Sequence, residues 1–212
     1  MQKISFSQFV ELIIPLAEKM VTSVELSEQK KGKSISCKKG CGACCREVVP
    51  LSIPEAFYLA EKFNVEPIRE KFSKNLLVLE KAEMNRSPLL QEASAYFDLQ
   101  LACPFLVEEG CSIHKNRPMA CREHLVSSNP NECRAMPNSS IQPLFFPKSF
   151  REALGNLAAT LLGQAPKMIP MIRVFEWTKT NEDLGERVWP KKELMKIFLN
   201  FLNPRPIPIP TI

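Results

Sequence analysis

Nine residues, Cys37 to Cys45, contain four of the eight cysteines of the chain in the order Cys-Lys-Lys-Gly-Cys-Gly-Ala-Cys-Cys. Thiols at this spacing can converge on one soft metal, and Gly40 and Gly42 permit the tight backbone path that this requires. Because Cys44 and Cys45 are adjacent, we expect their side chains to diverge. That geometry favours more than one metal, a cluster, or one ligand beside a spectator thiol. The segment therefore predicts a metal site.

The other four cysteines form a second group much later in the chain. Neither group has enough support to enclose a metal by itself, so we expect the two groups to meet in the fold. The predicted metal ligands are Cys37, Cys41, Cys44, Cys45, Cys103, Cys111, Cys121 and Cys133. Cys45 and Cys133 are either ligands of a second metal centre or free thiols beside the first.

Several linked motifs surround these cysteines. The first group reads C-x-x-x-C-x-x-C-C, and the second contains Cys103-Pro104-Phe105-Leu106, Gly110 to His114, and Arg117 to Arg122. In this order they resemble the YkgJ family of cysteine-cluster proteins, described as a zinc- or iron-chelating domain. The sequence departs from the expected pattern at His114, where relatives would carry an aromatic residue such as Tyr. The resemblance implies metal binding by residues 37–133 but no particular reaction.

Composition restricts the setting of this site. The 212 residues suffice for one sizeable core, and a net charge of +5 does not by itself argue for nucleic acid. The apolar stretch near the N-terminus is interrupted by Glu11 and Pro15, so it predicts neither a signal peptide nor a membrane span. We therefore expect a cytoplasmic protein, in which clustered cysteines are more often metal ligands than disulfides. Four disulfides in an exported protein are the alternative.

Hydrophobic periodicity predicts a mainly α fold: a single helical domain with a small β-hairpin and a cysteine-ligated metal site. The expected parts are an N-terminal helix and basic linker (1–36), the cysteine-cluster domain (37–133), and a helical support with a Pro-rich tail (134–212), packed as one unit. Helices are expected over residues 5–27 and from about residues 52, 67, 87, 118, 149 and 190. The signals include capping boxes at Ser5 and at Ser52 with Glu55, a cap at Ser149, and a helix end near Gly163. The hairpin is expected where residues 99–107 and 111–114 flank Glu108-Glu109-Gly110, with Cys103 and Cys111 near its two ends.

Two metals suit a site made of thiols alone, namely zinc and iron in an iron–sulfur cluster. The interval Cys37-x-x-x-Cys41-x-x-Cys44 is also the one that radical S-adenosylmethionine enzymes use for a four-iron cluster. Arg117 and Arg122 could hydrogen-bond sulfur or form surface ion pairs. The two histidines, His114 and His124, are expected to be packing residues, because the cysteines already supply enough ligands.

Three functions follow from these observations. The first is a metal-binding protein without a defined reaction. The second is a protein-modifying enzyme that uses S-adenosylmethionine, because flagellin lysine methylases resemble the family in their cysteine region. The third is a zinc-stabilised adaptor whose basic segment, Lys30 to Lys39, binds nucleic acid or an acidic protein partner. We favour the first, since the sequence shows ligands and no substrate machinery.

Overall fold

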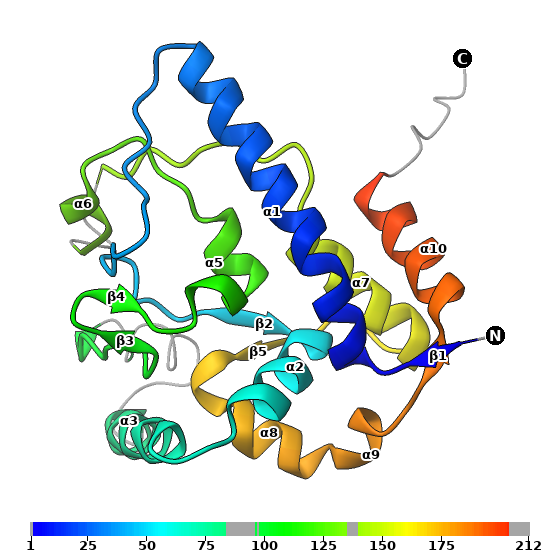
Figure 1. Ribbon diagram of the computed structural model, residues 1–212. Coiled ribbons are helices and arrows are strands. Elements are labelled where there is room, and N and C mark those ends of the chain that lie inside the picture. The colour runs from blue at the N-terminus through cyan, green and yellow to red at the C-terminus, as the bar shows by residue number, and fades with distance from the viewer. Residues whose placement is uncertain (1, 84–95, 97, 135–139, 204–212) are drawn as a thin grey trace, which may run out of the picture.

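The computed structural model describes residues 2–83, 96, 98–134 and 140–203, and this part of the protein is mainly helical, as predicted (Figure 1). The α-helices are α1 (Phe6–Lys30), α2 (Ile53–Phe63), α3 (Ile68–Glu83), α5 (Met119–Glu123), α6 (Pro130–Arg134), α7 (Phe150–Leu162), α8 (Val174–Thr180), α9 (Glu182–Gly185) and α10 (Lys191–Leu202). Short strands pair antiparallel: β1 (Lys3–Ile4) with β6 (Trp189–Pro190), β2 (Pro50–Ser52) with β5 (Met168–Pro170), and β3 (Leu106–Val107) with β4 (Gly110–Cys111).

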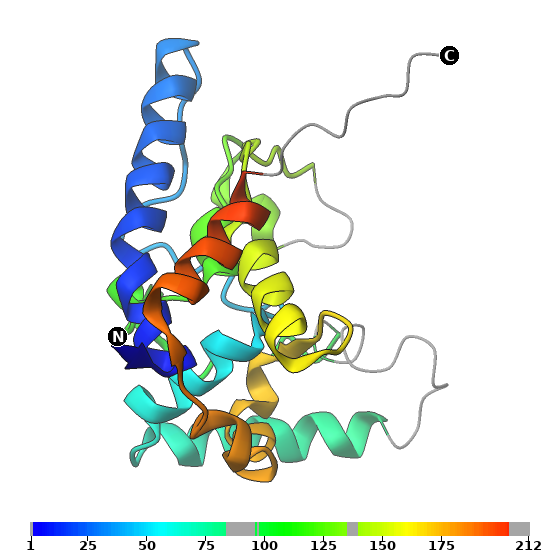
Figure 2. The same cartoon turned by 90° about the vertical axis from the view of Figure 1, so that its right-hand side faces the viewer.

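Helix α1 is the longest element described and lies along one side of the protein in the view of Figure 2. The predicted capping box is present, because Ser5 accepts a hydrogen bond from the Gln8 amide and the Gln8 side chain accepts one from the Ser5 amide. The helix continues through Pro15 and extends three residues beyond the predicted end at Ser27. Glu28, in its last turn, is buried and forms ion pairs with two of the lysines of the basic segment, Lys31 and Lys33.

The main core lies where α1, α2, α7 and α10 meet. Phe198 of α10 packs against Phe9 of α1 and Phe150 of α7, with ring centroids 5.6 Å and 5.4 Å apart. Figure 2 shows α10 beside α7. Helix α7 begins at the predicted cap, Ser149, and ends at Gly163, whose φ of 64° lies in the left-handed region that glycine adopts easily. The helices predicted from residues 52, 67, 149 and 190 are confirmed.

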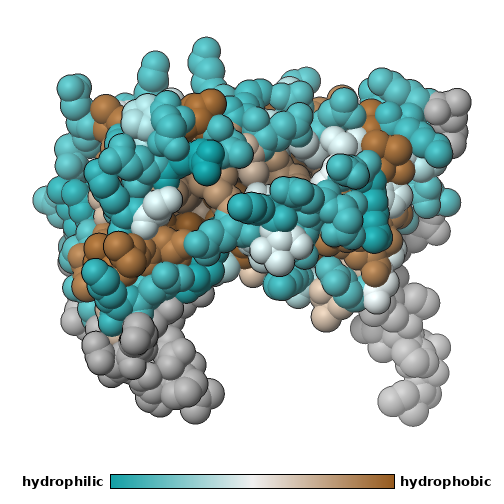
Figure 3. Space-filling view, turned by 90° about the horizontal axis from the view of Figure 1, so that it is seen from below, coloured by the Kyte–Doolittle hydropathy of each residue, from teal (hydrophilic) through white to brown (hydrophobic). Residues whose placement is uncertain are grey.

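Two strand pairs join distant parts of the chain and were not predicted, since their strands are too short for a periodic signal. Pairing of β2 with β5 places the segment after the first cysteine group beside Met168 to Pro170, and the Met171 amide donates to the Val49 carbonyl. The 3₁₀ turn η3 (Met171–Arg173) and α8 follow β5, in a region that the sequence pattern left unassigned. Figure 3 shows the lower face of the protein, where hydrophobic groups are separated by hydrophilic side chains.

The hairpin β3–β4 is present but shorter than predicted. The predicted helix from residue 87 and the Pro-rich tail lie outside the described residues. Within the described ranges, no helix combines the length and the apolar character needed to cross a membrane.

Candidate metal centre

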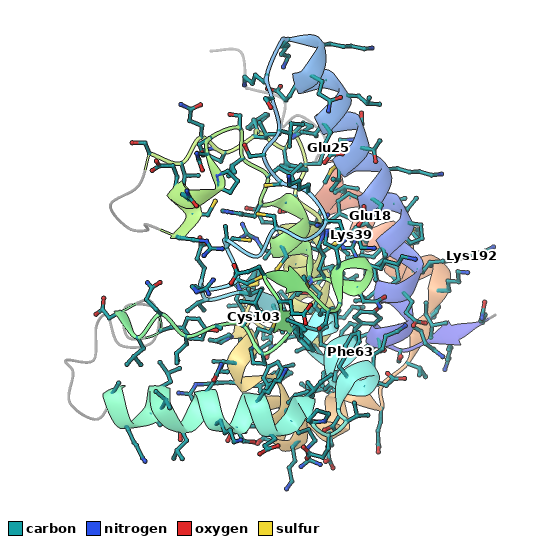
Figure 4. The ribbon with its side chains drawn as sticks, turned by 60° about the vertical axis from the view of Figure 1, so that its left-hand side comes forward. Glu18, Glu25, Lys39, Phe63, Cys103 and Lys192 are labelled. Atoms are coloured by element: carbon teal, nitrogen blue, oxygen red, sulfur yellow. The ribbon has the colours of Figure 1, made fainter. Side chains whose placement is uncertain are left out.

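All eight cysteines line one cavity of about 270 Å³, which confirms the prediction that the two groups meet. They are Cys37, Cys41, Cys44, Cys45, Cys103, Cys111, Cys121 and Cys133, and each is a free thiol. Helix α1 forms one wall, and the thiol-bearing segments form the others. Figure 4 labels residues from both: Glu18 and Glu25 on α1, and Lys39 and Cys103 on the segments that face it.

The first group lies on a loop of consecutive turns. The Cys41 amide donates to the Lys38 carbonyl over 3.0 Å, and the Cys45 amide donates to the Gly42 carbonyl over 3.1 Å. Gly42 packs tightly against the hairpin, because a Cβ atom placed there would lie 2.6 Å from the backbone oxygen of Glu109. The close approach of loop and hairpin therefore depends on glycine at this position.

The hairpin positions two thiols of the second group. The Cys103 amide donates a hydrogen bond of 2.7 Å to the carbonyl of Cys45, so the backbones of the two groups are joined directly. Glu108 and Glu109 have positive φ values and form the turn, which places Cys111 on β4 opposite Leu106. Cys103 and Cys111 thus lie at the two ends of the hairpin, as predicted.

Helix α5 carries Cys121 and is held by a glutamate at each end, the buried Glu55 and the half-buried Glu123. At its start the Glu55 carboxylate accepts a hydrogen bond of 2.6 Å from the Met119 amide. At its end Glu123 accepts from the amides of Phe150 and Arg151, at the N-terminus of α7. The start of a helix near residue 118 is confirmed, and Cys121 lies in its first turn.

Cys133 reaches the cavity through a fold-back of the chain. The Asn129 side chain accepts from the Asn131 amide, an Asx turn that begins the short helix α6. Glu109 forms ion pairs with Arg46, next to the first group, and with Arg134, next to Cys133. The hairpin turn, the first loop and α6 are therefore linked through one carboxylate.

Burial raises the pKa of most of these thiols, and nearby amides oppose that effect. Burial raises the pKa of Cys103 to about 12, while hydrogen bonds from the Phe105 and Leu106 amides lower it. Burial also raises the pKa of Cys37, and its sulfur accepts a hydrogen bond of 3.3 Å from the Val126 amide. Amides that point at sulfur stabilise the thiolate, which is the form that binds metal.

The two adjacent cysteines pack against different parts of the structure. Cys44 packs against the cluster of Ala43, Val126 and Cys133, whereas Cys45 packs against the main core. This packing agrees with the expectation that the two side chains diverge, although both thiols line the cavity.

The two arginines have different roles. Arg117 lies in the cavity wall and lowers the pKa of Cys37, Cys111 and Cys121, in each case against the larger effect of burial. Arg122 forms an ion pair, with Glu18 of α1, but its own side chain is not at the surface: it is 0% exposed and donates to the carbonyls of Arg117 and Lys115.

Both histidines also line the cavity. Arg117 donates a hydrogen bond of 2.7 Å to Nε2 of His114, and burial, followed by the charge of Arg117, lowers the pKa of that ring. Because a guanidinium has no acceptor, the neutral ring accepts through Nε2. The backbone carbonyl of His124 accepts from the Cys37 thiol.

The donor chemistry of the cavity fits a soft metal: eight thiols, amides directed at sulfur, and the half-buried guanidinium of Arg117. Across the described residues, no group of three or more His, Cys, Asp or Glu side chains is arranged so that it could hold a metal ion. The thiols surround the cavity without converging on one point, so ligation requires their side chains to turn.

Residues 36–140 match the family model CxxCxxCC, described as "Putative zinc- or iron-chelating domain". The chain has three residues between Cys37 and Cys41, one more than the name of the model gives. No curated protein and no solved structure gives a significant match. The family match supports a metal-binding domain of the CxxCxxCC family at residues 36–140, the stretch that contains all eight cysteines of the cavity.

Proposed function

We propose that the protein binds zinc or iron, the latter alone or in an iron–sulfur cluster, through the eight cysteines of the cavity. The observation that carries the proposal is the meeting of the two cysteine groups, which are separated by nearly sixty residues, around one cavity. Structural packing alone does not require eight free thiols to face the same space. The match to the CxxCxxCC family supports the same conclusion, and YkgJ membership is the finer assignment that we propose.

The chain supplies what thiolate ligation needs. Metal binding removes the thiol protons, and the charge of Arg117 together with the amides of Val126, Phe105 and Ile113 stabilises the resulting negative charge. A bound metal would supply further positive charge and join the loop, the hairpin and α5. We also propose a cytoplasmic location, since thiols that serve as metal ligands must stay reduced.

Anaerobic purification, followed by elemental analysis and an absorption spectrum, tests the proposal. We expect either zinc in a colourless protein, or iron with labile sulfide in a brown one. A double variant with one change in each group, Cys44→Ser with Cys103→Ser, should lose most of this metal. Ser34→Ala, an exposed change on the segment leading to Cys37, should retain it. Purified protein without zinc or iron, or a double variant with full metal content, would contradict the proposal.

A further inference from the structure

We propose that the eight cysteines form two neighbouring four-thiol centres, and that the division falls between Cys44 and Cys45. The first centre consists of Cys37, Cys41, Cys44 and Cys133. The second consists of Cys45, Cys103, Cys111 and Cys121. This inference rests on the metal binding proposed above and assigns each thiol to one centre.

Packing separates the first set from the second. Cys133 is buried in a small cluster with Ala43 and Val126, and the cysteines packed against that cluster are Cys37, Cys41 and Cys44. Val126 also holds the start of this loop: its carbonyl accepts from the Ser36 amide, and its amide donates to the Cys37 sulfur. Packing therefore defines the first set.

The second set belongs to the main core. Cys103 is part of that core, and Cys45 and Cys111 pack against it. The hydrogen bond from the Cys103 amide to the Cys45 carbonyl fixes two members of the set, and the hairpin fixes the third. Cys121 joins them through α5, since Met119, the first residue of that helix, is part of the same core.

The adjacent pair is where the two sets touch. Cys44 packs with the first set and Cys45 with the second, and the two residues are consecutive in the chain. Consecutive Cα atoms are about 3.8 Å apart, so two centres that divide this pair must be neighbours. Four thiolates are the complete ligand set of a structural zinc ion or of an iron–sulfur cluster. The division explains why two successive cysteines are needed on one loop.

The wild-type holo-protein provides the first test. A limiting amount of chelator is added, free thiols are alkylated in a short pulse, and the intact mass is measured before peptide mapping. We expect molecules with zero, four or eight adducts, and the four-adduct species should carry them on one of the two sets. Species with a continuous range of adducts, or four adducts spread over both sets, would overturn the division.

Two single variants provide the matched test. Cys133→Ser should halve the metal content and expose Cys37, Cys41 and Cys44, with the other set still protected. Cys103→Ser should do the same for Cys45, Cys111 and Cys121. If either variant exposes all of its thiols while wild-type protein is protected, there is a single centre, and metal binding still stands. If wild-type protein holds no metal and all eight thiols react, the proposed function fails as well.

Discussion

The carboxylate of Glu55 on α2 accepts a hydrogen bond of 2.6 Å from the amide of Met119, the first residue of α5. Its other oxygen accepts from the amide and the hydroxyl of Ser52. One buried side chain thus caps α2 and also fixes the start of the helix that carries Cys121. The position of Cys121 in the cavity therefore depends on the core helix α2, and substitutions in the core should change the arrangement of the thiols.

Replacing Glu55 by Gln should destabilise the protein by about 1–3 kcal/mol, the usual cost of leaving a buried hydrogen-bonding group unsatisfied. An amide has only one acceptor oxygen, whereas Ser52 and Met119 present donors to both carboxylate oxygens. Urea unfolding of chelator-treated protein measures this difference. Glu61→Gln, an exposed change on the same helix, should have little effect.

The stability difference between wild type and Glu55→Gln should depend on pH. Burial raises the pKa of Glu55, so the folded protein takes up this proton at a higher pH than the unfolded chain does. The contribution of this group to stability is therefore present at acidic pH and is lost as pH rises through the raised pKa. Since Gln does not titrate, the stability difference between wild type and Glu55→Gln should be larger at pH 5 than at pH 7.5. A difference independent of pH would contradict this account.

Replacing Gly42 by Ala should separate the first cysteine loop from the hairpin. The added Cβ would lie 2.6 Å from the Glu109 carbonyl oxygen and 2.5 Å from the Leu106 side chain, and the backbone oxygen cannot rotate away. Overpacking of this kind typically costs about 1–3 kcal/mol. We expect lower thermal stability and reduced metal content.

Gly110→Ala is the matched control for the hairpin. A Cβ added at Gly110 would lie 3.5 Å and 3.6 Å from the nearest atoms, which is ordinary van der Waals contact. The φ of Gly110 is not in the left-handed region. Gly42→Ala should have a clearly lower melting temperature and bind less metal per chain than Gly110→Ala. Equal behaviour would show that the contact at Gly42 is not needed.

Replacing Arg122 by Ala should disturb the segment before α5. Its guanidinium donates to the carbonyls of Lys115 and Arg117, and Arg117 in turn faces the thiols. Loss of these buried hydrogen bonds should cost about 1–3 kcal/mol. Arg187→Ala, which removes an exposed pair with Asp183, should change stability little. Equal unfolding midpoints for the two variants would show that Arg122 does not hold this segment.

The ends of helices that carry strong local capping signals could be predicted from the sequence. The capping boxes at Ser5 and Ser52, the cap at Ser149 and the glycine after α7 fixed the beginnings and ends of helices, because these interactions span only a few residues. The cysteine spacing likewise predicted a shared site. The metal, the number of centres and the reaction are not local properties, and they stay predictions or proposals.

Long-range contacts were not predictable in the same way. Glu55 matched a capping box, and nothing in its own segment indicates a second partner sixty-four residues later. Arg122 was expected at sulfur or on the surface and is instead buried against carbonyl groups. The side on which Cys44 and Cys45 each pack depends on the loop conformation, which no periodic pattern describes.

The last prediction concerns the protons that metal binding must displace. Burial raises the pKa of Cys103 to about 12 and that of Cys133 to about 11, so both thiols are protonated at neutral pH in the metal-free protein. Each thiol that becomes a ligand must lose its proton, and its contribution to metal affinity should therefore rise by about tenfold per pH unit below its pKa. The affinity for metal should increase with pH, and the slope of its logarithm against pH should reflect the number of thiols that lose a proton.

Zinc added to metal-free protein in weak buffer with a pH indicator measures this release. We expect close to one proton per ligated thiol, with a smaller release in Cys133→Ser and an unchanged release in the control Ser34→Ala. A competition assay at pH 6.5 and pH 8 should show tighter binding at the higher pH. Binding without proton release would mean that zinc is held by groups other than these thiols, because a protonated thiol is not a zinc ligand.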